Sequence, residues 1–176
     1  MPERDLPMDP YVLGYWLGDG SSRCSNIACW DEDEEHVSAA LQAAGYLTSV
    51  TVAHGRTLYI RFGHERRHGR LYGGSADLGS ARVLGRKHIP DEYLYASAEQ
   101  RLALAQGLLD ADGYVAKNGS AEWCTVLKEM AYQFAQLLRT LGVRVNVKES
   151  DAKLYGRVAG KRYRLTFKPY RHQQLF

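Results

Sequence analysis

The chain has 176 residues, of which 45% are hydrophobic and 24% charged, with a formal net charge of +3. This length allows one sizeable domain or two small fused halves. The sequence has no long apolar stretch and no signal-peptide pattern, so we expect a cytoplasmic protein rather than a membrane-spanning or secreted one. The three cysteines form no C-x-x-C motif, which argues against a disulfide framework or a zinc site.

The first half contains signals for two helices and three extended segments. Asp9 and Pro10 form a helix start, with an N-cap followed by proline, and Gly20 supplies the stop. Periodicity then predicts, in chain order, a helix over 10–19, an extended segment at 25–30, a helix over 34–44 and strands at 49–53 and 57–62. We expect a flexible connection over residues 73–85, and core or sheet-packing positions for Trp16, Trp30 and Trp123.

The second half repeats this order. Ser97 and Gln100 form a capping box, and Gly113 ends the helix that follows. The predicted elements are a helix over 97–112, strands at 114–116 and 121–126, a helix over 127–141 and strands at 143–148 and 162–167. The pattern favours an α+β fold of two pseudo-symmetric αββαββ halves, residues 1–90 and 91–176, within one compact pseudo-dimeric domain.

Two matching motifs, at residues 12–20 and 105–113, end their helices in Asp-Gly. A carboxylate at a helix C-terminus faces the negative end of the macrodipole, so this position lowers stability. Small residues four apart precede each acid: Gly14 and Gly18 in the first motif, and Gly107 and Ala111 in the second. If these faces pack together, Asp19 and Asp112 converge, and a cation between them would relieve their repulsion. Oxygen ligands of this kind suit Mg²⁺.

The paired motifs resemble those of the two-motif, monomeric LAGLIDADG homing endonucleases. The second motif is close to the consensus, whereas the first has Leu17 where many members have an acid. The stretch Arg86-Lys87-His88-Ile89-Pro90 is similar to the endonuclease domain of a bacterial intein. The native context would be an intein, and the alternative is a free-standing relative. The resemblance implies a saddle of antiparallel strands over double-stranded DNA, cleavage of both strands of a long target and 3′ overhangs.

The resemblance also implies roles for particular residues. Asp19 and Asp112 would be catalytic and bind Mg²⁺, with Mn²⁺ able to substitute, and the carbonyls of Gly18 and Ala111 would be further metal ligands. Lys87 would be catalytic. The second half has no matching block, so its lysine would be Lys161 or Lys168. Asp110 is interpreted as a structural residue rather than a ligand.

The outward strand positions carry Arg, Lys, Thr, Asn and Tyr side chains, which suit a sheet lying in the major groove. The candidate DNA contacts are Arg23, Arg56, Tyr59, Arg61, Lys117, Arg144, Lys148, Arg157, Arg162 and Arg164. The acidic run at 31–35 is expected to cap its helix and to point away from DNA. The alternative function is a catalytically inactive DNA- or RNA-binding protein of the maturase or regulator type, which the retained acid pair disfavours.

Overall fold

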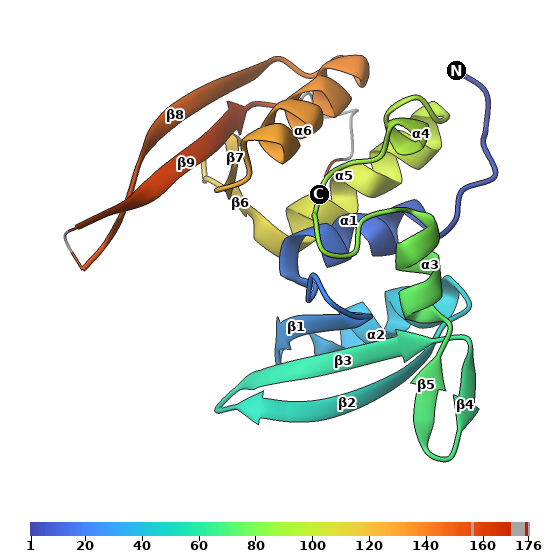
Figure 1. Ribbon diagram of the computed structural model, residues 1–176. Coiled ribbons are helices and arrows are strands. Elements are labelled where there is room, and N and C mark those ends of the chain that lie inside the picture. Colours follow the sequence, from blue (N-terminus) through green and yellow to red (C-terminus); the bar gives the residue numbers. More distant parts are fainter. Residues whose placement is uncertain (156, 170–174, 176) are drawn as a thin grey trace.

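The computed structural model describes residues 1–155, 157–169 and 175 (Figure 1). The elements up to residue 80 are α1 (Pro10–Asp19), β1 (Asn26–Trp30), α2 (Glu34–Ala43), β2 (Leu47–His54), β3 (Thr57–Gly63), β4 (Glu65–Arg67), β5 (Arg70–Tyr72) and α3 (Gly74–Ser80). They are followed by α4 (Asp91–Leu94), α5 (Ala98–Asp112), β6 (Gly113–Val115), β7 (Ala121–Thr125), α6 (Lys128–Thr140), β8 (Val145–Leu154) and β9 (Arg157–Phe167). The α+β class and the antiparallel sheets are as the sequence predicts.

Two related sheets flank the central helices. The first has the strand order β1-β3-β2 and the second β6-β7-β9-β8, with antiparallel neighbours throughout. In the second sheet, β6 follows α5 and pairs Gly113 with Trp123. At the equivalent place after α1, only an isolated bridge joins Gly20 to Ile27, so the first strand of the αββαββ pattern is reduced there to a single residue pair. In Figure 1 the β2–β3 and β8–β9 hairpins project to the same side of α1 and α5.

The predicted starts of α1 and α5 both have N-cap hydrogen bonds. The Asp9 carboxylate accepts a hydrogen bond from the Val12 amide at 3.0 Å, which satisfies a free amide of the first turn. The Ser97 side chain accepts from the Gln100 amide, and the Gln100 side chain accepts from the Ser97 amide, which completes the capping box. Both helix starts are confirmed.

Glycines allow α1 and α5 to touch along their backbones. A Cβ atom on Gly14 would overlap the carbonyl oxygen of Leu104, and one on Gly107 would overlap the carbonyl oxygen of Tyr11. A Cβ on Gly18 would lie 2.5 Å from the Cβ of Ala111. The small-residue faces of the two motifs therefore form the helix interface, as their spacing predicts.

The core lies on both sides of this helix pair. Trp16 and Trp123 are buried, with 0% and 1% of their surfaces exposed, and each indole donates a hydrogen bond to a backbone carbonyl, of Cys24 and Leu108 respectively. Trp30 lies at the end of β1 and is 59% exposed, so of its two predicted positions, core or sheet, the core position is wrong. Ile27 and Cys29 take the inward positions of β1, and the alternation of a strand turns Trp30 outward.

The predicted flexible connection contains a helix, α3. Leu78 is fully buried, and the Asp77 carboxylate accepts a hydrogen bond from the Tyr46 hydroxyl at 2.8 Å and contacts Nε2 of His64 at 2.6 Å. These contacts come from residues distant in sequence, so the glycine-rich local pattern does not reveal them. None of the helices in the described part of the chain has the length and apolar character that a bilayer-spanning helix needs.

Replacing Gly14 with alanine tests the helix contact. The added methyl would push the Leu104 backbone away, so Gly14→Ala should lower the free energy of unfolding by roughly 1–3 kcal/mol in urea titrations. The control is Gly79→Ala in α3, where a Cβ would meet only Leu84 at 3.9 Å and where alanine favours the helix. Equal stability of Gly14→Ala and the wild type would contradict the close contact.

Candidate active site

The two acids meet where α1 and α5 end. The Asp112 Oδ2 atom lies 3.3 Å from the position that a Cβ on Gly18 would take. The carboxylate of the second motif therefore reaches the last turn of the first helix, next to Asp19. Convergence of the two acids, predicted from the small-residue spacing, is what the structure shows.

This environment opposes two negative charges. Asp19 is partly buried, and loss of hydration, followed by the nearby Asp112 charge, raises its pKa to about 6. The pKa of Asp112 is also raised by loss of hydration, although its residue surface remains exposed. The positive charge of Lys87 acts in the opposite direction on both carboxyl groups. The acid pair therefore depends on neighbouring positive charge.

Lys87 lies at the centre of the site. Its Nζ donates a hydrogen bond to the Gly18 carbonyl at 2.8 Å and lies 5.3 Å from the centre of the Trp16 ring. Burial lowers the pKa of Lys87 to about 8, against the raising effect of Asp19 and Asp112. The ammonium group thus contacts the carbonyl that the sequence predicts as a metal ligand.

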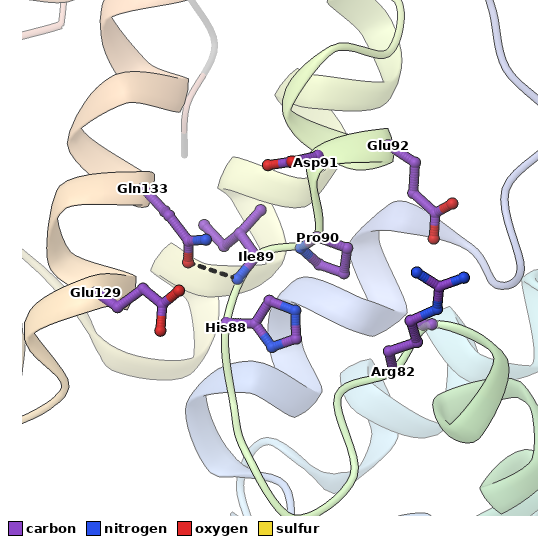
Figure 2. Close-up of a pocket in the computed structure, with 9 residues that line it drawn as sticks. Arg82, His88, Ile89, Pro90, Asp91, Glu92, Glu129 and Gln133 are labelled. Carbon is purple, nitrogen blue, oxygen red and sulfur yellow. Dashed lines mark hydrogen bonds between the residues drawn. The ribbon is translucent and has the colours of Figure 1, made fainter.

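Helix α6 holds the loop that carries Lys87. On one side of the lysine, Arg86 forms an ion pair with Glu129 at 2.5 Å, and on the other the Ile89 amide donates to Gln133 Oε1 at 2.9 Å. Figure 2 shows Glu129 and Gln133 on α6 beside a cavity of 320 Å³ that this loop lines. No local pattern in the sequence marks Glu129 or Gln133, because each is more than forty residues from its partner in the loop.

The two alternative lysines lie elsewhere. Lys161 pairs with Asp151 at 2.9 Å and Glu149 at 3.6 Å within the β8–β9 hairpin. The Lys168 side chain lies beside the β6–β7 turn, 3.8 Å from where a Cβ on Gly119 would be. The structure brings neither of them to the acid pair through the contacts of the described residues.

Asp110 has a structural environment. It accepts a hydrogen bond from the Tyr11 hydroxyl at 2.8 Å, and His36 Nε2 lies 3.8 Å from the same carboxylate. This matches its interpretation as a hydrogen-bonding residue on another face of α5.

The donors at the acid pair fit a hard divalent cation. Among the described residues, no three or more His, Cys, Asp or Glu side chains form a cluster that could hold a metal. Two carboxylates and the carbonyls of Gly18 and Ala111 supply oxygen only. Mg²⁺ accepts such a sparse oxygen set because it retains water and takes phosphate oxygens as further ligands.

A hollow lies between Asp19 and the first sheet. It measures 440 Å³ and is lined by Asp19, Gly20 and Ser21 together with Asn26, Ala28 and Tyr59. Tyr59 and Arg61 occupy outward positions of β3 and alternate with Ile60 and Phe62, which are fully buried. In the second sheet, Arg164 pairs in register with Lys148, and its guanidinium lies 3.5 Å from Glu122. Ser21 and Asn26 were not predicted to lie beside the acids.

The other residues predicted to contact DNA differ in how exposed they are. Arg162 is partly buried, opposite Ser150 in the β8–β9 ladder. The exposed ones are Arg23, Lys117, Arg144, Lys148 and Arg157.

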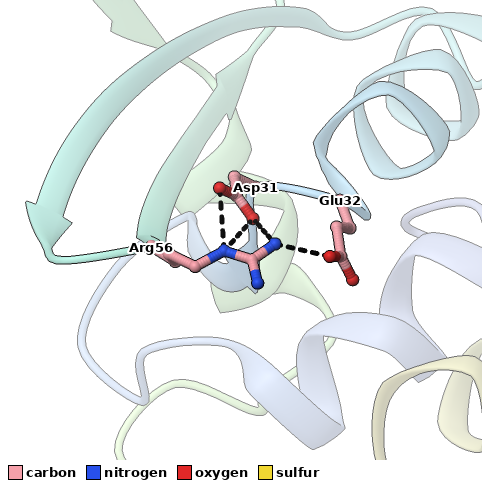
Figure 3. A network of polar contacts seen from close by, with 3 residues as sticks. All are labelled: Asp31, Glu32 and Arg56. Carbon is pink, nitrogen blue, oxygen red and sulfur yellow. Dashed lines mark hydrogen bonds and ion pairs between the residues drawn. The ribbon is translucent and has the colours of Figure 1, made fainter.

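Arg56 is engaged by the acidic run. Its guanidinium contacts Asp31 at 2.7 Å and Glu32 at 2.5 Å (Figure 3). It also lies 5.9 Å from the Trp30 ring centre. The acidic run does begin α2, with Asp33 at the N-cap and Glu34 and Glu35 in the first turn, but the Asp33 side chain makes no capping hydrogen bond. Asp31 and Glu32 instead neutralise a predicted DNA contact at the end of the first sheet.

Comparison with known proteins agrees with this architecture. Residues 99–170 match the family described as a LAGLIDADG-like domain. The structure of I-DmoI in complex with DNA and Mn superposes with a TM-score of 0.62 at 16% identity, covering 92% of this chain and 89% of that one. Full-length DUF199/WhiA from Thermatoga maritima gives a TM-score of 0.54 at 11% identity, over 94% and 53% of the chains. Residues 99–170 thus form a LAGLIDADG-like domain, and the chain has the fold of the LAGLIDADG homing endonucleases.

Two longer proteins are similar in sequence. A replicative DNA helicase DnaB from Mycobacterium intracellulare is 32% identical over 167 residues, which is 95% of this chain and 25% of the helicase. An A-type ATP synthase subunit from Pyrococcus abyssi is 28% identical over 153 residues, or 83% and 15%. The chain spans a quarter or less of the curated relatives that it matches.

The raised pKa of Asp19 predicts a pH-dependent stability. The folded protein holds a proton that the unfolded chain releases, so between about pH 4 and 6 the free energy of unfolding contributed by Asp19 falls as pH rises. Asp19→Asn removes this loss. The difference in the free energy of unfolding between Asp19→Asn and the wild type should shift in favour of the variant by roughly 1–2 kcal/mol from pH 4 to pH 7, after allowance for solvent screening.

Urea unfolding of metal-free protein at several pH values measures this advantage. Asp31→Asn is a control of opposite sign, because Arg56 lowers the pKa of Asp31. An Asp19→Asn advantage that is constant with pH would show that the carboxyl group titrates normally.

Proposed function

We propose that the protein is a site-specific, divalent-metal-dependent endonuclease that hydrolyses both strands of a long DNA target and leaves 3′ overhangs. The observation that carries this proposal is the meeting of Asp19, Asp112 and Lys87 at the end of the helix pair. A structural domain gains nothing from two poorly hydrated acids that repel each other. A phosphodiesterase needs such a pair to hold cations against a phosphate.

Each residue at the centre has a role that its surroundings support. Asp19 and Asp112, with the carbonyls of Gly18 and Ala111, would hold the ions. When bound, divalent ions activate the attacking water and stabilise the leaving oxygen. Lys87 would order that water or offset negative charge that develops on the phosphate. Its position in a loop held by α6 keeps the ammonium fixed without any contribution from DNA.

The two sheets would form the DNA-binding saddle, with I-DmoI, described in complex with DNA, as the relevant similar structure. We further propose that the halves are residues 1–90 and 91–176, that the chain acts as a monomer and that its native context is an intein. The intein context is supported by the two longer relatives, because this chain matches only a small part of a helicase and of an ATP synthase subunit. Neither of those names describes a nuclease, as expected if the matched part is an insertion.

A cleavage assay on a randomised duplex library tests the activity directly. The wild type with Mg²⁺ should cut a discrete sequence on both strands, and EDTA should abolish cutting. Asp19→Asn and Asp112→Asn should each lose double-strand cleavage while retaining DNA affinity. The reason is that the two acids would bind the metal ions and are not part of the basic surface that binds DNA. Asp110→Asn is the matched control on the same helix and should cut normally.

The outcome separates the enzyme from the inactive binding protein. Selective DNA binding without cutting at any Mg²⁺ or Mn²⁺ concentration would favour the binding protein. Normal cutting by the Asp19→Asn, Asp112→Asn double variant would refute the assigned site.

Lys87 should be required in the chemical step. Lys87→Met should lower the single-turnover cleavage rate by about 10²–10³-fold, since a preorganised charge at the phosphate is lost. Lys161→Met is the comparison. Because Lys161 is paired within the β8–β9 hairpin, this variant should cut at the wild-type rate. The reverse order of these two effects would assign the catalytic lysine to the second half.

A further inference from the structure

The β4–β5 hairpin is fixed against the first sheet. The His64 amide donates to the Tyr72 carbonyl at 2.7 Å, Arg66 donates to the Thr48 carbonyl at 3.1 Å, and β5 contacts both β2 and β3. Figure 1 shows the hairpin beside the end of β3 that lies away from the β2–β3 turn. In the second half, Lys168 follows β9 directly, without such a hairpin over the described residues.

The hairpin adds a wall to the outward face of the sheet. A hollow of 190 Å³ lies between them, lined by Asn26, Ser49, Thr51 and Arg61 on the sheet side and by Arg70 on the hairpin side. It is smaller than the roughly 300–1,000 Å³ typical of small-molecule sites, so it suits one edge of a larger ligand. With Tyr59, which also lines it, the hollow offers two guanidinium groups, three hydroxyls and an amide.

The two arginines of this hollow differ from others nearby. Arg56 is held by two acids, and Arg67 pairs with Glu65 at 2.9 Å. Arg61 uses its Nε to donate to Asn26 Oδ1 at 3.1 Å, which fixes the side chain and leaves its terminal nitrogens for a ligand. Neither Arg61 nor Arg70 forms an ion pair within the described residues, and both are exposed. Their charge therefore suits an external acceptor.

The hollow shares part of its lining with the hollow beside Asp19. Asn26 and Tyr59 line both this hollow and the one that contains Asp19. A duplex whose phosphate lies at Asp19 would thus run over the outward face of β1 and β3 toward Arg70. Arg70 was absent from the sequence-based contacts, because its segment carries no strand periodicity that would place it on this face.

We propose that Arg70 and Arg61 together determine sequence specificity by binding the major-groove edge of a guanine in the part of the target facing the first half. This rests on the proposed function. Guanine presents two acceptors, N7 and O6, and arginine is the side chain that most often binds them. The hairpin brings Arg70 opposite Arg61, so a single base edge meets donors from two sides.

Binding selection from a randomised duplex library, in EDTA so that no cleavage occurs, tests the proposal. Arg70→Ala should lose a guanine preference of about 5- to 100-fold at one or two adjacent positions and keep it elsewhere. Arg61→Ala should affect the same positions, and the double variant should lose little more than either single one. Arg67→Ala, on the same hairpin, should select the wild-type sequence. Arg164→Ala should alter different positions, toward the other end of the target.

The alternatives give distinct results. An unchanged profile for Arg70→Ala, with a selective wild type, would overturn this proposal alone. A uniform loss of affinity with a shallower salt dependence would also overturn it, since it would assign Arg70 to a phosphate. A wild type that selects no sequence would overturn both this proposal and site-specific DNA recognition. Thermal melting of each variant checks that the exposed substitutions leave the fold intact.

Discussion

The backbone contact between α1 and α5 is the constraint on which the rest of the structure depends. Gly14 and Gly107 have no side chains at the crossing, so each helix approaches the other's carbonyl oxygens. Any larger residue would separate the helices, and with them the sheets that pack on either side. The same contact brings the ends of the two helices together, and so places Asp112 beside the last turn of α1. The interface between α1 and α5 therefore determines both the packing of the sheets and the position of the acid pair.

The acids that this contact brings together need positive charge, and the structure provides it from one side only. Lys87 donates to the Gly18 carbonyl, and its loop is held by Glu129 and Gln133 on α6 of the other half. The lysine therefore comes from the loop before α4, and α6 supports that loop. No equivalent contact joins Lys161 or Lys168 to the acids among the described residues. A symmetric fold thus has an asymmetric centre.

The two sheets are also unequal. The first has the additional β4–β5 hairpin on its outward face and a cluster of Asp31, Glu32 and Arg56 at its end, where the positive charge is cancelled. The second has longer strands, β8 and β9, with Arg164 next to Lys148. A nucleic acid lying across both sheets would meet different chemical groups in each half, as recognition of a non-palindromic sequence requires.

The sequence by itself determined the repeated helices, their caps, most of the strands and the convergence of Asp19 and Asp112. Those features follow from local spacing: proline and N-caps begin helices, alternation marks strands, and small residues four apart mark a helix contact. Only the tertiary structure decided that 74–80 is helical, that Trp30 is exposed and that Arg56 is neutralised. It alone placed Gln133 against the Lys87 loop and Arg70 opposite Arg61. These outcomes depend on side chains distant in the sequence, and no local period records which distant partner a polar group will meet.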